Sequence, residues 1–147
     1  MTTLYKTSAK ALAGRNGKVK TDDGLLDLEL AYPKEMGGSG AATNPEQLFA
    51  AGYSACFSNA ILHVAREAKV AISQAPVTAE VGIGPNDNGG FALTISLAAE
   101  VDLPQEQALE LTRVAHQVCP YSNAVRGNID VQVTVLSLIH ISEPTRP

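Results

Sequence analysis

The first thirty residues alternate apolar and polar positions as a three-stranded meander does. Residues 4–12 predict a short edge strand, and Asn16-Gly17 before the strand-like residues 18–21 is a hairpin signal. A second turn at residues 22–24 precedes residues 25–30, in which apolar and acidic side chains alternate. That alternation is typical of a strand with one buried face.

A long apolar segment follows a glycine-rich loop. Its start, residues 43–47, offers Thr43 or Asn44 as an N-cap, then a proline in the first turn, and so predicts the beginning of a helix. The helix would run to about residue 69, and over residues 49–60 nearly every face of it is apolar. Such a helix is buried on all sides, so we expect the sheet or another chain to cover it.

The rest of the chain predicts an α+β fold. Residues 76–84 and 91–101 predict the two strands of a hairpin, and residues 103–118 a helix that ends before a proline. A further helical turn at residues 121–126 and a last strand at residues 129–138 complete the chain. The order of elements predicts one domain with antiparallel sheet over residues 1–138. Residues 139–147 show no periodicity, and we expect them to be a non-native tail.

Composition and charge narrow the classes of partner. The chain is 45% hydrophobic and 18% charged, which suits a packed core, and its net charge of −4 argues against a nucleic-acid partner. No apolar run approaches the ~20 residues of a membrane span. The first residues lack the apolar centre of a secretory signal. We therefore expect a cytoplasmic protein with no nucleic-acid or membrane partner.

The two cysteines, Cys56 and Cys119, are 63 positions apart, so they form no zinc motif. His63 and Glu67 lie four residues apart in the predicted helix but lack a third ligand, and we expect no metal. From the residues alone, two interpretations of the cysteines stay open. They are buried packing groups, or Cys56 is an attacking thiol held in a helix and Cys119 a resolving thiol at a helix end.

Three segments carry a resemblance to a known family. Residues 42–57, around Cys56, closely resemble the first cysteine motif of the organic hydroperoxide resistance family, part of the larger OsmC-like group. Residues 118–128 resemble its second cysteine motif, and residues 14–19 its arginine loop. The likeness covers about residues 4–135. One departure is Val125, where many relatives carry threonine.

The resemblance implies an OsmC-like fold, with antiparallel sheets around a long central helix, in an intertwined homodimer. It also implies a thiol peroxidase without a bound cofactor. Cys56 would attack an alkyl or fatty-acid hydroperoxide, and Cys119 would close a disulfide with it. Arg15 would stabilise the Cys56 thiolate, and Glu46 would hold Arg15. The reductant would be a lipoyl-type dithiol, carried by a lipoylated protein.

Elementary chemistry fits the roles of Arg15 and Glu46, although a solvated turn residue and a plain helix-capping residue are the simpler interpretations. Arginine is a permanent cation, and a carboxylate in the first turn of a helix stays ionised. Glu46 and Cys56 are ten residues apart, about 15 Å along a continuous helix. Either the helix breaks near Gly52, or Arg15 and Glu46 serve Cys56 of a partner chain.

Other residues are weaker candidates. Tyr53, Phe57 and Tyr121 would line a substrate pocket or pack in the core, and the loop with Met36 would cover the site. His116 is expected on a helix face. Two other functions stay open: an osmotic-stress relative with broader peroxide use, and a small-molecule binding module with inert cysteines.

Overall fold

The computed structural model describes residues 1–137, which fall into two compact units. The first is Met1–Leu48, and the second begins at Phe49. The expected tail at residues 139–147 lies outside the described residues. The assignment of residues 1–138 to one domain stays a prediction.

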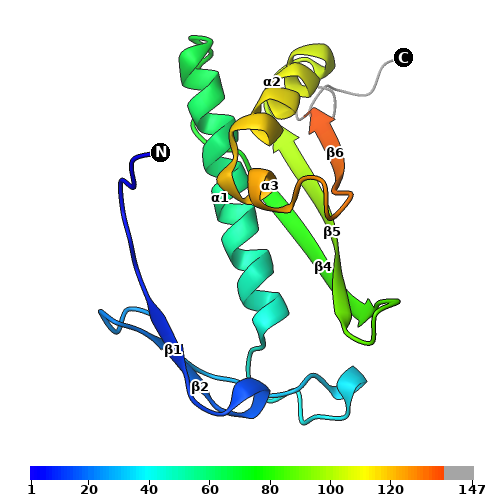
Figure 1. Cartoon of the computed structure of the whole chain (residues 1–147). Coiled ribbons are helices and arrows are strands. Elements are labelled where there is room, and N and C mark those ends of the chain that lie inside the picture. The colour runs from blue at the N-terminus through cyan, green and yellow to red at the C-terminus, as the bar shows by residue number, and fades with distance from the viewer. Residues whose placement is uncertain (138–147) are drawn as a thin grey trace. The chain divides into compact units, whose positions relative to one another are not determined.

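The first unit contains the predicted meander. Strands β1 (Ala9–Ala11), β2 (Lys18–Thr21) and β3 (Asp27–Glu29) pair antiparallel in that order. A 3-10 turn at Gly14–Asn16 joins β1 to β2 (Figure 1), and Gly14 has a φ of 61°, which suits a glycine. The sheet is confirmed, although β1 and β3 are shorter than the sequence predicts. A second 3-10 turn spans Lys34–Met36.

Helix α1 (Pro45–Glu67) begins where the capping signal predicts. The Gln47 N–H donates to Asn44 Oδ1 at 2.9 Å, so Asn44 is the N-cap and Thr43 is not. The Gln47 side chain accepts instead from the Thr43 hydroxyl at 2.6 Å. This pattern leaves the carboxylate of Glu46 available for another partner.

Of the two alternatives for Glu46 and Cys56, a helix break near Gly52 is wrong, because α1 is continuous from Pro45 to Glu67. The glycine has a different reason. A Cβ at this position would lie 2.8 Å from the hydroxyl oxygen of Tyr121, closer than real Cβ contacts allow. Gly52 therefore lets the Tyr121 ring lie against the helix one turn before Cys56.

The second unit contains a three-stranded sheet. β4 (Val77–Pro85) and β5 (Phe91–Val101) form an antiparallel hairpin, whereas β6 (Gln132–Ser137) pairs parallel with β5. The prediction of antiparallel pairing is thus wrong for β6. Helices α2 (Gln105–Val118) and α3 (Pro120–Val125) make the crossover that a parallel neighbour requires.

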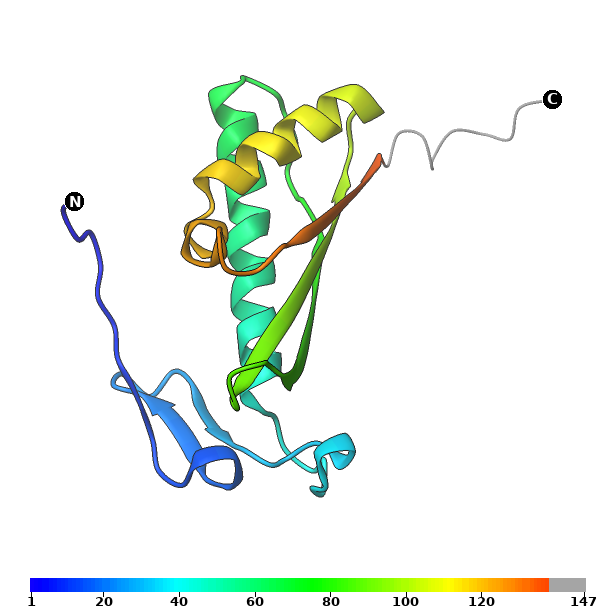
Figure 2. The same cartoon turned by 45° about the vertical axis from the view of Figure 1, so that its right-hand side comes forward.

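The core of this unit lies between the sheet and its helices. Side chains at alternate positions of β5 are buried, which places one face of the sheet inward. Figures 1 and 2 show α2 and α3 beside the middle and upper part of α1. The central residues of this core are Tyr53, Phe57, Ile61, Leu97, Val101, Ala108, Ala115 and Cys119.

Helix α1 is long and apolar enough, by length and composition, to cross a membrane. An 18-residue window has a mean hydropathy of 1.3, although polar residues interrupt its apolar run, so the expectation that no segment approaches a membrane span does not hold by this measure. One such helix is a weak indication, since the core helix of a soluble protein passes the same test. A third of the window is buried inside the chain, and α1 carries core residues such as Tyr53 and Phe57.

Candidate active site

The two cysteines meet although 63 positions separate them in the chain. The thiol of Cys119 donates to Cys56 Sγ, with the sulfurs 3.5 Å apart, and both thiols are free. A disulfide needs an S–S distance of about 2.05 Å, so closure requires a shift of roughly 1.5 Å. Cys56 is half-buried on α1, whereas Cys119 is fully buried at the corner between α2 and α3.

The surroundings of Cys56 favour its neutral form. Burial raises the pKa of the Cys56 thiol above its ordinary value, the backbone N–H of Tyr121 lowers it by donating to the sulfur, and Cys119 raises it again. Among the described residues, no cation contributes to the Cys56 pKa. A thiolate at Cys56 would therefore need a positive charge beyond the groups that set this pKa.

Aromatic residues close in sequence to the two cysteines form a cluster of rings. Tyr53 lies one turn before Cys56, and its ring centre is 5.7 Å from that of Tyr121 and 6.4 Å from that of Phe57. Phe49 packs edge-on against both tyrosines, at 6.2 and 6.3 Å. Tyr53 and Phe57 are fully buried, whereas Tyr121 is 40% exposed. A pocket role for these three residues stays a prediction. Met36, in the other unit, is 38% exposed.

A hydrogen-bonded chain beside the cysteines was not predicted from the sequence. The hydroxyls of Tyr53 and Ser122 lie 2.7 Å apart, and His116 Nδ1 lies 2.8 Å from Ser122 Oγ. His116 was expected on a helix face; it lies on α2, where its ring is half-buried and bonded to Ser122. The available signal was spacing: His116 and Ser122 each lie three residues from Cys119.

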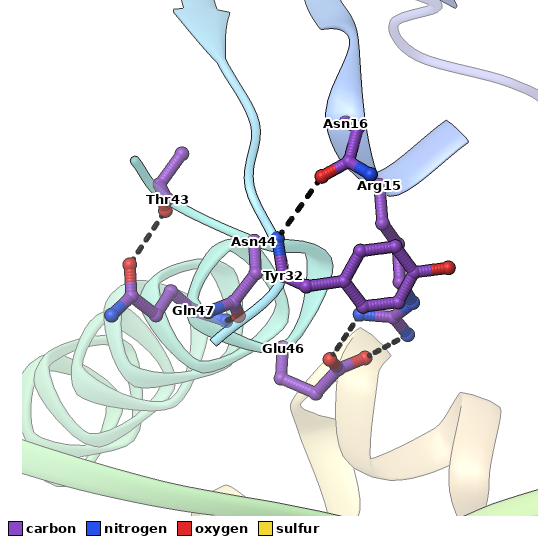
Figure 3. A network of polar contacts seen from close by, with 7 residues as sticks. All are labelled: Arg15, Asn16, Tyr32, Thr43, Asn44, Glu46 and Gln47. Carbon is purple, nitrogen blue, oxygen red and sulfur yellow. Dashed lines mark hydrogen bonds and ion pairs between the residues drawn. The ribbon is translucent and has the colours of Figure 1, made fainter. Parts of the chain in front are cut away.

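The first unit brings together Arg15 and Glu46, which are 31 positions apart (Figure 3). Arg15 Nη1 donates to Glu46 Oε1 at 2.6 Å, and Nη2 donates to Oε2 at 2.9 Å. This two-pronged geometry is the strong form of an arginine–carboxylate pair. The side chains are 22% and 15% exposed, so the simpler interpretations, a solvated turn and a plain capping residue, do not describe them.

The pair keeps both groups charged. The hydrogen bonds from Arg15 hold the pKa of Glu46 below its ordinary value, and the bonds to Glu46 raise the pKa of Arg15. Asn16 supports the arginine turn, because its Oδ1 accepts from the Tyr32 N–H at 3.4 Å. The turn thus presents a fixed cation whose charge does not vary at physiological pH.

His63 and Glu67 form only a loose surface pair. His63 Nε2 lies 4.0 Å from Glu67 Oε1, and the two side chains are 52% and 76% exposed. Within residues 1–137, no three His, Cys, Asp or Glu side chains are grouped to hold a metal ion.

Comparison with known proteins points in one direction. The sequence model of the OsmC-like protein family matches residues 37–134. The chain is 46% identical over 135 residues to the organic hydroperoxide resistance protein of Xanthomonas axonopodis pv. citri, covering 90% of this chain and 94% of that protein. The chain belongs to the organic hydroperoxide resistance family of OsmC-like proteins.

Solved structures agree with membership of the organic hydroperoxide resistance family. OhrB of Bacillus subtilis is 40% identical, with a TM-score of 0.82 over 90% of this chain and 99% of OhrB. A Vibrio cholerae protein with captopril bound in one of its active sites is 75% identical, with a TM-score of 0.90 over 92% of this chain and 94% of that one. The predicted α+β fold of this family is confirmed, and a role in peroxide resistance follows.

Proposed function

We propose that the protein is a thiol peroxidase that reduces organic hydroperoxides to alcohols. The observation that carries the proposal is the contact between a half-buried and a fully buried free thiol, 3.5 Å apart in a family of peroxide-resistance proteins. Inert packing cysteines have no need to face each other from two distant segments. A nucleophile and its resolving thiol do.

The cycle has two chemical steps. The Cys56 thiolate attacks the terminal oxygen of the hydroperoxide, the O–O bond breaks, the alcohol leaves with a proton, and Cys56 becomes a sulfenic acid. Cys119 then attacks the sulfur of Cys56, the S–S bond forms, the S–O bond breaks, and water leaves. A dithiol reductant restores both thiols by exchange, and we propose that it is the lipoyl group of a lipoylated protein.

Arg15 and Glu46 supply the charge that this cycle needs. A guanidinium beside Cys56 would lower the pKa of the thiol and orient the peroxide, while Glu46 would hold the guanidinium in place. Support comes from the two-pronged ion pair in the first unit and from the absence of a cation among the groups that set the Cys56 pKa, within residues 1–137.

We further propose that the protein acts as a homodimer. Helix α1 is apolar along most of its length, yet only a third of its most apolar window is buried within the chain. Because α1 is continuous, Glu46 and Cys56 are about 15 Å apart along its axis. A second copy would cover the helix and offer its Arg15–Glu46 pair to Cys56. The cytoplasmic location expected from the sequence remains part of this proposal.

The proposal is tested by counting thiols before and after one equivalent of an alkyl hydroperoxide. We expect the loss of two thiols per chain and the mass of one internal disulfide. Retention of both thiols would favour a binding module with inert cysteines. A turnover assay with dihydrolipoamide, glutathione or thioredoxin then identifies the reductant, and we expect activity with the first. Comparable rates with hydrogen peroxide would favour the osmotic-stress type.

A further inference from the structure

Three polar side chains form a connected chain beside the cysteine pair, outside the four residues of the proposed chemistry. Tyr53 Oη lies 2.7 Å from Ser122 Oγ, and Ser122 Oγ lies 2.8 Å from His116 Nδ1. Tyr53 and Ser122 are fully buried. Each hydroxyl has one proton to donate, so Ser122 accepts from one neighbour and donates to the other.

The direction of this chain follows from its surroundings. Burial, and then the charge of Arg126, lower the pKa of His116, which keeps the ring neutral and lets Nδ1 accept. Burial raises the pKa of Tyr53, which keeps its hydroxyl protonated and able to donate. Donation from Tyr53 to Ser122 and from Ser122 to His116 therefore satisfies the buried polar atoms of these three side chains.

These hydrogen bonds join α1, which carries Cys56, to α2 and α3, which flank Cys119. Tyr53 lies on α1 three residues before Cys56, and Ser122 lies on α3 three residues after Cys119. His116 lies in the last turn of α2, three residues before Cys119. Ser122 thus ties both sides of the Cys119 corner to the helix that holds Cys56.

A second set of contacts fixes the same corner from outside. Arg126 donates through Nη2 to the carbonyl oxygen of His116 and through Nη1 to Asn123 Oδ1. These contacts link the end of α2 to α3 but do not reach α1. Within residues 1–137, and apart from the contacts that Cys56 Sγ itself makes with Cys119 and Tyr121, the hydrogen-bonded link from this corner to the Cys56 helix is the hydroxyl pair of Tyr53 and Ser122.

We propose that Ser122, bridged between Tyr53 and His116, is the positioning residue for disulfide closure. It holds Cys119 Sγ at contact distance from Cys56, so that disulfide formation is faster than further oxidation of the sulfenic acid. This inference rests on the proposed function. It concerns only the second step, in which the Cys119 thiol proton and the departing hydroxyl leave together as water.

The test separates the two steps in the full chain. Sulfenic acid is trapped with dimedone at short times after one equivalent of cumene hydroperoxide, and disulfide formation is followed by mass spectrometry. In Ser122→Ala we expect closure to slow on the order of 10- to 100-fold, as for a misplaced reacting group, with sulfenic acid formation within about twofold of wild type. His116→Leu, which breaks one of the two bonds, should slow closure less.

Thr112→Val is the matched control, because Thr112 is a buried hydroxyl on α2 whose hydrogen bond within residues 1–137 goes to the Ala108 carbonyl at 2.8 Å, away from the Cys119 corner. It should close at the wild-type rate. Wild-type closure in Ser122→Ala, or equal slowing in the control, would overturn the inference. If Ser122→Ala does not fold, His116→Leu decides.

Failure of the proposed function can be told apart from failure of the Ser122 inference, because the wild-type protein would then not react with peroxide. If wild type does not react with peroxide, closure is driven instead by the dithiol oxidant diamide. The same ranking of Ser122→Ala, His116→Leu and Thr112→Val is expected there, and equal closure rates would again overturn the inference.

Discussion

The two units of the chain treat their reactive groups in opposite ways. In the first, Arg15 and Glu46 stabilise each other as ions through two hydrogen bonds of 2.6 and 2.9 Å. In the second, Cys56 and Cys119 lie among aromatic and aliphatic groups, and burial raises the pKa of Cys56. One unit holds a permanent charge, and the other a thiol whose own surroundings favour its neutral form.

Neither unit by itself contains all the groups that the proposed chemistry requires. A bidentate ion pair in a small unit is easily interpreted as a structural clasp, and two buried cysteines as packing groups. Under the proposed function, the two units supply the parts of a thiol peroxidase: a thiol, a cation, a carboxylate that fixes the cation, and a resolving thiol. The variants below separate these parts.

The largest effect is expected for Cys56→Ser. A serine hydroxyl stays protonated at neutral pH and is a poor nucleophile toward peroxides, so reduction of alkyl hydroperoxide should fall to the uncatalysed rate. The measurement is peroxide consumption with dihydrolipoamide in excess. Substantial turnover in this variant would remove the proposed mechanism, and Ser58→Ala, a change of similar size on the same helix, serves as the control.

Cys119→Ser is expected to react once and then stop. Cys56 should become a sulfenic acid at close to the wild-type rate, because Cys119 acts only afterwards. Without a resolving thiol, that acid should proceed to the sulfinic form more readily than in wild type. Intact-mass analysis after graded peroxide additions follows the products, and a Cys56 that remains reduced would contradict the assigned order of the two thiols.

The next effect concerns the cation. Arg15→Ala should slow Cys56 oxidation at neutral pH by about 10- to 1,000-fold, since a nearby positive charge lowers a pKa by 1–3 units. Arg15→Lys should restore part of the rate, because it keeps the charge but not the planar grip on Glu46.

Glu46→Ala should also slow oxidation, and the double variant should cost little more than either single one. Additive effects would show that the two residues do not act as a unit. Glu110→Ala, which removes the exposed partner of Arg113, is the matched control for losing an arginine-bound carboxylate.

Many elements of the fold can be predicted from the sequence, because they depend on local patterns of residues. The alternation in residues 91–101 and the capping signal at Asn44 are local patterns, so they predict β5 and the start of α1 closely. The cysteines and Arg15 were found by resemblance, because contacts across 63 and 31 positions leave no local pattern.

Three features of the structure cannot be predicted from local sequence patterns. The parallel pairing of β6 depends on the path of a crossover, which strand propensity does not encode. Gly52 suggests a bend by composition alone, whereas its neighbour Tyr121 comes from a different helix. The bridge from Ser122 to Tyr53 joins residues 69 positions apart, and serine is too common in turns and helix ends to attract attention.

The smallest effect is a dependence of stability on pH. Because the pKa of Glu46 is lowered in the folded chain, its contribution is fully present above its ordinary value of 4.5 and is lost as pH falls through the folded value. Wild type should exceed Glu46→Gln in free energy of unfolding by about 1 kcal/mol at pH 7. Denaturant titrations of both proteins should converge below pH 4.5, and a difference that persists in acid would refute the ionic origin.

The most direct test of the account is the pKa of the Cys56 thiol itself. It is measured by the ultraviolet absorbance of the thiolate in the Cys119→Ser background, with Arg15 present and with Arg15→Ala. We expect the pKa of the Cys56 thiol to lie below its ordinary value of 9.0 when Arg15 is present, and above that value when Arg15 is absent. An identical Cys56 pKa in the two proteins would contradict the proposal that Arg15 activates the Cys56 thiol.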